Sequence, residues 1–167
     1  SCGDIDAEKV MAQATEEQQR IRKQFFQPGN GDETIAGLRG ELTTTMEEGA
    51  GIYRTGESLQ ATCNTIRELK ERFGNVELAD HSLTFNTELT SALELEYMLD
   101  VAEALAHSAL ARKESRGSHQ RIDYPERDDG QYLRHSLAYY GDGDPRIDYL
   151  DVVITRWPPG ERVYGSK

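Results

Sequence analysis

Most of the residues that could do chemistry lie in one segment, residues 112–129. It holds five basic residues, five carboxylates and one histidine within 18 positions, although the whole chain carries a formal net charge of −11. Arginine matches carboxylates in bidentate pairs, so balanced charge in an acidic chain predicts an ion-pair and hydrogen-bond network. A solvated loop of compensating charges is the alternative. The candidate residues are Arg116, His119, Arg121, Asp123, Arg127, Asp128 and Asp129.

Gly117 and Pro125 break this segment and fold it back on itself. We therefore expect Arg116 and Arg127 to bond to the carboxylates of Asp123, Asp128 or Asp129, or to backbone carbonyls of the turn. His119 lies near Asp123 in the sequence and is a candidate for a buried ion pair with it. Three roles are open for the segment: a structural clamp, a contact to a partner subunit, or an anion site.

Other chemistry finds little support in the residues. Gly49-Ala-Gly51 lacks the third glycine of a dinucleotide-binding turn and follows a helical pattern, and Gly29-Asn-Gly31 follows no strand. The four histidines stand apart, without the spacing of a zinc site. The sequence therefore predicts no catalytic, cofactor-binding or metal-binding residue in this chain.

Four apolar periodicities predict the helices that position the segment, followed by a hairpin signal. The expected helices span about 6–26, 34–49, 58–73 and 86–115, and the expected strands span 133–140 and 146–155. The predicted fold is mainly α, an up-and-down three- or four-helix bundle followed by a small β-hairpin tail. Residues 1–117 form the bundle, and residues 118–167 form the charged turn and hairpin tail packed on it, as one structural domain.

The longest helix has the most continuous apolar row. Leu93, Tyr97, Val101 and Leu105 follow one another at steps of four, so we expect them to be mostly buried.

Length and composition bound the rest. At 167 residues the chain is long enough for one domain with a real core, and its acidity argues against nucleic acid as a partner. No membrane span or signal peptide is visible, and Cys2 and Cys63 show no disulfide framework, which favours a cytoplasmic location. The start at Ser1 is consistent with an excised domain.

Several strings, in the same order, resemble the C-terminal region of the flavoprotein subunit of succinate dehydrogenase and fumarate reductase. The resemblance covers nearly the whole chain and is weakest over the first thirty residues. The strings are Glu47-Glu-Gly-Ala-Gly-Ile-Tyr-Arg54, Glu68-Leu-Lys-Glu-Arg-Phe73, Phe85-Asn-Thr-Glu-Leu89, Ala109-Leu-Ala-Arg-Lys-Glu-Ser-Arg-Gly-Ser-His-Gln-Arg121, Asp123-Tyr-Pro125, Glu126-Arg-Asp-Asp129 and Ile154-Thr-Arg-Trp-Pro-Pro-Gly-Glu-Arg-Val-Tyr-Gly165.

This resemblance implies a fragment of an oxidoreductase that interconverts succinate and fumarate in the tricarboxylic acid cycle and in electron transport. The parent subunit would pass electrons through FAD to an iron–sulfur subunit and on to quinone, as a peripheral complex on the cytoplasmic face of the membrane. The FAD-binding and capping domains would precede this chain, which would be inactive alone, would bind no cofactor and would not insert into the membrane. The related L-aspartate oxidases share a shorter form of the Glu114–His119 string. The C-terminal domain of such an oxidase and a stand-alone helical interaction module remain alternatives.

Overall fold

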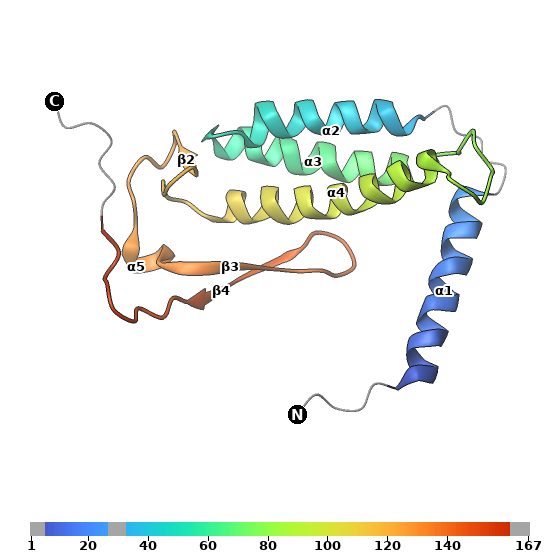
Figure 1. Ribbon diagram of the computed structural model, residues 1–167. Coiled ribbons are helices and arrows are strands. Elements are labelled where there is room, and N and C mark those ends of the chain that lie inside the picture. Colours follow the sequence, from blue (N-terminus) through green and yellow to red (C-terminus); the bar gives the residue numbers. More distant parts are fainter. Residues whose placement is uncertain (1–5, 27–32, 161–167) are drawn as a thin grey trace.

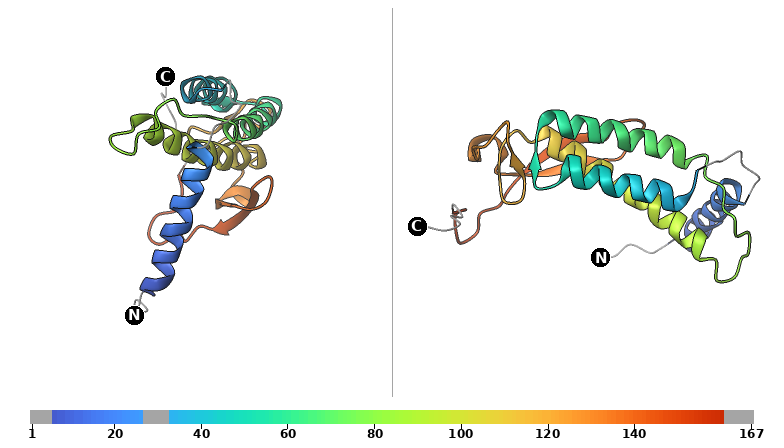
Figure 2. Two further views of the ribbon diagram at one scale, coloured as in Figure 1. Left: turned by 90° about the vertical axis from the view of Figure 1, so that its right-hand side faces the viewer. Right: turned by 90° about the horizontal axis from the view of Figure 1, so that it is seen from above.

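The computed structural model describes residues 6–26 and 33–160, and its centre is a bundle of three antiparallel helices (Figure 1). These are α2 (Ile35–Ala50), α3 (Gly56–Phe73) and α4 (Thr87–Ala111), each in contact with the other two. The predicted mainly α fold, a helical bundle with a hairpin tail, is confirmed. Two views at right angles show that α2 and α3 lie side by side with α4 crossing beneath them (Figure 2).

Each bundle helix begins at a side chain that satisfies a free amide of its first turn. Thr34 accepts a hydrogen bond from the Gly37 amide at 3.1 Å, and Asn86 accepts one from the Leu89 amide at 2.7 Å. Thr55 and Ser58 form a reciprocal capping box at the start of α3.

The core lies between the three helices. Near the end of α3 it also includes Phe25, Phe73, Val76 and Leu78. Gly49, in the last turn of α2, brings α2 and α3 unusually close, because a Cβ atom there would lie 2.0 Å from the hydroxyl oxygen of Thr62. The most deeply buried large side chains are Phe25, Leu38, Leu59, Ile66, Leu69, Leu78, Leu95 and Leu99.

The predicted buried row of α4 is wrong. Tyr97, Val101 and Leu105 are 60%, 66% and 42% exposed, and Leu93 is half-buried. The core face lies on the neighbouring row, whose small residues allow close helix approach. That row consists of Ala92, Leu95, Leu99, Ala102, Ala106 and Ala109. Because α4 is apolar around most of its circumference, periodicity alone did not distinguish the two rows.

Helix α1 (Ala7–Phe25) projects away from the bundle (Figure 1). Only Phe25 of this helix is buried, and its ring lies 5.9 Å from that of Phe73 in an edge-on arrangement. Arg20 also bonds to Glu96 of α4 at 2.8 Å. The bundle therefore has three full members, and α1 attaches to one end of it.

The C-terminal part contains the predicted hairpin and two elements that the sequence did not predict. Strands β3 (Arg134–Tyr139) and β4 (Arg146–Asp151) pair antiparallel, with Arg134 opposite Asp151. Unpredicted are the short parallel pair β1 (Tyr53–Arg54) and β2 (Gln120–Arg121) and the one-turn helix α5 (Asp129–Tyr132). Helix α4 also ends at Ala111, four residues before the predicted end, because the backbone at Arg112 is extended.

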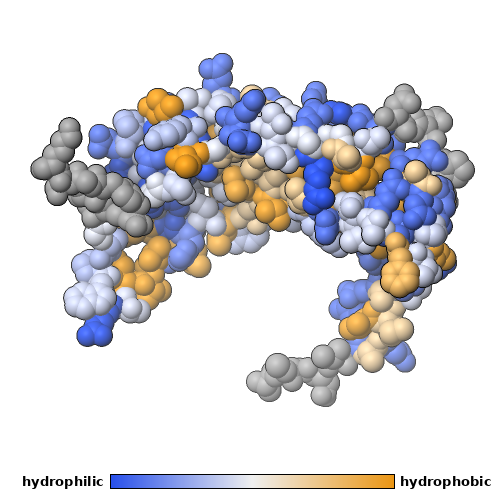
Figure 3. All heavy atoms as spheres, turned by 45° about the horizontal axis from the view of Figure 1, so that its top comes forward, coloured by the Kyte–Doolittle hydropathy of each residue, from blue (hydrophilic) through white to orange (hydrophobic). Residues whose placement is uncertain are grey.

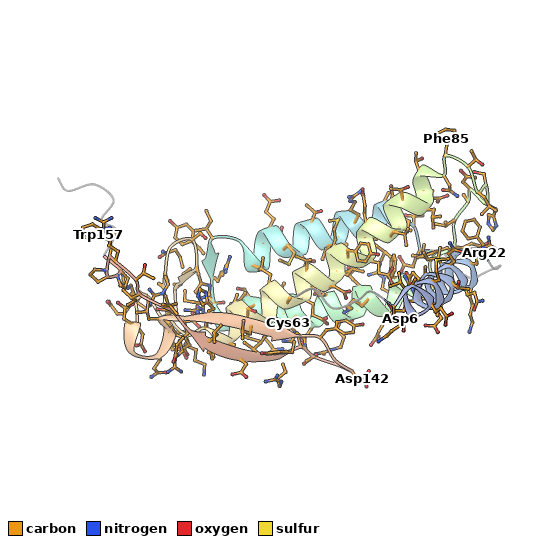
Figure 4. The ribbon with its side chains drawn as sticks, turned by 60° about the horizontal axis from the view of Figure 1, so that its bottom comes forward. Asp6, Arg22, Cys63, Phe85, Asp142 and Trp157 are labelled. Atoms are coloured by element: carbon orange, nitrogen blue, oxygen red, sulfur yellow. The ribbon has the colours of Figure 1, made fainter. Side chains whose placement is uncertain are left out.

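Large apolar side chains are exposed at both ends of the molecule. Phe85, at the tip of the loop between α3 and α4, is 97% exposed, and Trp157, in the segment after the hairpin, is 76% exposed (Figure 4). None of the helices within 6–26 and 33–160 is both long enough and apolar enough to cross a membrane.

Candidate functional site: the charged turn

Residues 112–129, called the charged turn from here on, connect α4 to the hairpin and return the chain to the junction of α2 and α3. Arg116 and His119 exchange backbone hydrogen bonds of 2.8 and 3.0 Å around Gly117, which has a φ of 59°. A positive φ at the first central residue is typical of a tight hairpin turn with glycine in that position. The Gln120 amide then donates to the Ile52 carbonyl at 3.1 Å and places β2 beside β1.

Glu114 is the central carboxylate of the charged turn, and its side chain is fully buried. It accepts hydrogen bonds from Arg112, from Arg116 at 2.9 and 3.0 Å, and from the Asp128 amide at 2.9 Å. Burial by itself would raise the pKa of Glu114, but these donors outweigh it and hold the pKa below its usual value. Glu114 therefore remains ionised and draws three parts of the charged turn together.

Arg112 joins the end of α4 to the hairpin. Its guanidinium donates to the carbonyls of Tyr132 at 2.7 Å and Arg134 at 2.6 Å. It also lies 5.5 Å from the ring of Tyr132 and 6.0 Å from that of Tyr149, within cation–π range.

Arg121, 2% exposed, connects the end of α4 to the start of α3. It donates to the carbonyls of Ala109 and Leu110 at 3.3 Å, two of the free acceptors at the C-terminus of α4. It also forms two 2.7 Å bonds to Asp123, whose carboxylate accepts the Gly56 amide of α3 at 2.9 Å. A cation thus lies at a helix C-terminus and an anion at a helix N-terminus, as both helix dipoles favour.

The hydrogen bonds from Arg121, with that from the Gly56 amide, lower the pKa of Asp123 well below its usual value. This ion pair was not predicted in this form, because Asp123 was expected to meet Arg116, Arg127 or His119.

His119 lies among arginines, and the expectation that it would pair with Asp123 is wrong. Its Nδ1 is 2.9 Å from the guanidinium of Arg54, and its Nε2 is 3.1 Å from the carbonyl oxygen of Arg112. Since a guanidinium only donates and a carbonyl only accepts, His119 is neutral with its proton on Nε2. Burial, together with nearby positive charge, lowers the pKa of His119.

The outer rim of the charged turn contains the predicted arginine–carboxylate bonds. Arg116 bonds to Asp129 at 2.6 Å, and the Nε of Arg127 bonds to the same carboxylate at 2.8 Å. Arg127 also donates to the Gly160 carbonyl at 3.0 Å. Asp128 pairs differently, since its side chain accepts the Gln131 amide at 2.9 Å and caps α5.

The sequence interpretation omitted Glu114 and Arg112, which prove to be central. Both belong to the segment 112–129, and Glu114 opens the Glu-Ser-Arg-Gly-x-His string. The predicted helix extended to residue 115 and therefore included Arg112 and Glu114. Because α4 in fact ends at Ala111, both residues lie in the turn that follows the helix.

The charged turn joins the end of α4, the start of α3 and the segment before the hairpin. Glu114, Arg116, Arg121 and Asp123 each bond to charged or backbone partners. In the described part of the chain, no group of three or more His, Cys, Asp or Glu side chains is arranged to hold a metal ion. Gly49-Ala-Gly51 does not fit a flavin pyrophosphate, because the space beside Gly49 is filled by Thr62 of α3.

Fold and site define a helical-bundle domain whose charged turn ties the ends of two helices to a hairpin. The family model for the C-terminal part of the fumarate reductase flavoprotein matches residues 39–164, which include most of α2, all of α3 and α4, the charged turn and the hairpin. The chain belongs to this family.

Individual relatives agree with the family match. The fumarate reductase flavoprotein subunit of Mycobacterium tuberculosis is 52% identical over 157 residues, covering 93% of this chain and 27% of that protein. The succinate dehydrogenase flavoprotein subunit of Rickettsia felis is 39% identical over 143 residues, covering 81% and 24%. A solved quinol fumarate reductase of Escherichia coli superposes with a TM-score of 0.90 at 46% identity, covering 100% of this chain and 29% of that one. The chain thus spans less than a third of the length of these relatives.

Proposed function

We propose that this chain is a structural domain of a flavoprotein subunit that interconverts succinate and fumarate. The 52% identity to a fumarate reductase flavoprotein subunit, extending over 93% of the chain, carries this proposal. In the complete protein, electrons pass through FAD to an iron–sulfur subunit and on to quinone. A similar solved structure, with a TM-score of 0.87, is described as a quinol-fumarate reductase with menaquinol molecules, which supports a quinone/quinol couple as the redox partner of the parent complex.

We assign the flavin and the dicarboxylate to the FAD-binding and capping domains of the parent polypeptide. The glycines at 49 and 51 serve helix packing and helix termination and form no pyrophosphate cradle, and Gly29-Asn-Gly31 lies outside the described residues. The isolated chain is therefore expected to be colourless and inactive. The complex as a whole is expected to be peripheral on the cytoplasmic face of the membrane.

The role of the charged turn in this proposal is to hold the domain in one arrangement. Glu114 and Arg121 are almost fully buried. Arg121 bonds to the end of α4 and, through Asp123, to the start of α3. Glu114 bonds to Arg112, which donates to the carbonyls of Tyr132 and Arg134 at the start of the hairpin. A domain fixed in this way presents a constant surface to the flavin-binding part of the protein. Arg116, His119, Arg127, Asp128 and Asp129 act in the same network, without contacting substrate.

The test uses the complete flavoprotein subunit that contains this chain, purified with its iron–sulfur subunit. We expect stoichiometric FAD, succinate-dependent reduction of an artificial electron acceptor, and fumarate-dependent oxidation of a reduced viologen dye. Oxidation of L-aspartate without turnover of succinate or fumarate would instead identify the parent as an L-aspartate oxidase and refute the proposal.

A further inference from the structure

One long face of the bundle is apolar and has no cover in the described part of the chain. It is the groove between α2 and α4, about 760 Å³ in volume, and its exposed large apolar members are Tyr97, Val101 and Leu105. We call it the α2/α4 seam. Its apolar lining residues are Leu42, Met46, Tyr97, Met98, Val101, Ala102 and Leu105. Hydrophobic side chains gather along the middle of the bundle in the space-filling view (Figure 3).

The opposite side of α4 is covered by the chain itself. The hairpin loop reaches α3, where Asp144 bonds to Arg67 and the ring of Tyr140 lies 5.9 Å from the ammonium of Lys70. Helix α1 reaches α4 through Arg20 and Glu96. Both α1 and the hairpin lie on the side of the bundle away from α2 (Figure 1). The chain therefore covers the α3/α4 side and leaves the α2/α4 seam open.

Among the described residues that line it, the α2/α4 seam carries no unpaired charge. Its charged residues, Arg39 and Glu94, bond to each other at 3.1 Å, and Arg39 also contacts the sulfur of Met98 at 3.5 Å. The seam is thus neutral on a chain of net charge −11. An apolar face without free charge is typical of interfaces that form once during folding and stay closed, whereas separable partners meet through surfaces about as polar as the rest of the protein.

We propose that the α2/α4 seam is the surface on which the upstream flavin-binding part of the same parent polypeptide docks. This inference rests on the proposed function. The chain covers only 27% of a fumarate reductase flavoprotein subunit to which it is 52% identical, so most of such a polypeptide is available as the occupant.

Two other occupants fit the seam less well. A covalently linked segment is present at high effective concentration and needs no charge steering, whereas a separate iron–sulfur subunit would gain from unpaired charges on the seam. A second copy of this chain would bring two acidic molecules together against their mutual repulsion.

The experiment measures the reactivity of a cysteine placed on the seam, Val101→Cys, toward a maleimide. Glu68→Cys, on an exposed position of α3, is the matched control, and the native Cys63 is buried. Labelling of each site is followed by peptide mass spectrometry in three samples: the isolated chain, the complete flavoprotein subunit alone, and that subunit with its iron–sulfur partner.

We expect both sites to react in the isolated chain. In the complete flavoprotein subunit alone, we expect Val101→Cys to react at least about tenfold more slowly than in the isolated chain. The rate for Glu68→Cys should be the same in both samples. Protection that appears only after the iron–sulfur subunit is added would overturn the proposal, and so would full reactivity in all three samples. Protection in the isolated chain that grows with its concentration would show self-association and overturn it too.

Turnover of the same samples separates this inference from the function on which it rests. A subunit active on succinate whose Val101→Cys remains reactive refutes the docking surface alone. A subunit that turns over neither succinate nor fumarate refutes the proposed function, whatever the labelling shows.

Discussion

Replacing Arg121 by alanine is the most informative single change in the charged turn. The substitution removes the donor to the Ala109 and Leu110 carbonyls and leaves Asp123 without its bidentate partner. Arg121 is 2% exposed, so water replaces these bonds poorly. Breaking a fully buried pair from one side costs about 3–5 kcal/mol. Because the remaining Asp123 side chain is 36% exposed, we expect a cost at the lower end of this range, about 3 kcal/mol. That is still a large share of the roughly 5–15 kcal/mol that stabilises a typical domain.

The assay is urea unfolding of the isolated chain, followed by circular dichroism, with Arg134→Ala as the matched control. Arg134 pairs with Asp151 at 2.9 Å, but their side chains are 47% and 84% exposed. An exposed pair of this kind contributes about 0–1 kcal/mol. If Arg121→Ala unfolds at the same urea concentration as Arg134→Ala, the charged turn does not hold the domain together and the reasoning fails.

The remaining predictions concern packing and pH. Gly49→Ala should lower the melting temperature because its new Cβ has no room, whereas Gly40→Ala, with nothing within 4 Å, should be neutral or stabilise α2 by about 0.5–1 kcal/mol. Leu99→Ala should lower the free energy of unfolding by about 2–5 kcal/mol, and Val101→Ala should lower it by no more than about 0.5 kcal/mol. A larger loss for Val101→Ala than for Leu99→Ala would show that the row containing Val101 faces the core after all. Because the pKa of His119 is lowered on folding, the unfolded chain binds the proton first, and stability should fall as the pH drops below 6.5. Denaturant unfolding at several pH values should show a shallower fall for His119→Gln, and identical slopes would contradict this.

Local signals in the sequence predicted the elements better than their contacts. The hairpin formed by the predicted strands 133–140 and 146–155 was correctly interpreted, since a turn depends on neighbouring residues. The phase of α4 was not, because two apolar rows compete and only the partner helices decide between them. The two rows differ in position, since one faces the core while Tyr97, Val101 and Leu105 of the other line the α2/α4 seam.

In the charged turn, too, the sequence predicted local features but not the contacts to distant elements. Composition indicated that the charged turn is an ion-pair network, and Arg116, Arg127 and Asp129 do bond to one another. The partner of Asp123 was not predictable in the same way, because it depends on how the turn returns to the start of α3. Glu114 was missed because the predicted helix did not end at Ala111.

The central claim is that this domain supports a succinate/fumarate flavoprotein without taking part in its reaction. Turnover per bound FAD in the complete subunit, measured with succinate for the His119→Gln and Arg116→Ala variants, tests it most directly. We expect flavin content or thermal stability to fall while turnover per bound FAD and the KM for succinate stay at wild-type values. Fully folded, fully flavin-loaded variants whose turnover per FAD collapses would contradict it and would place the charged turn in the chemistry.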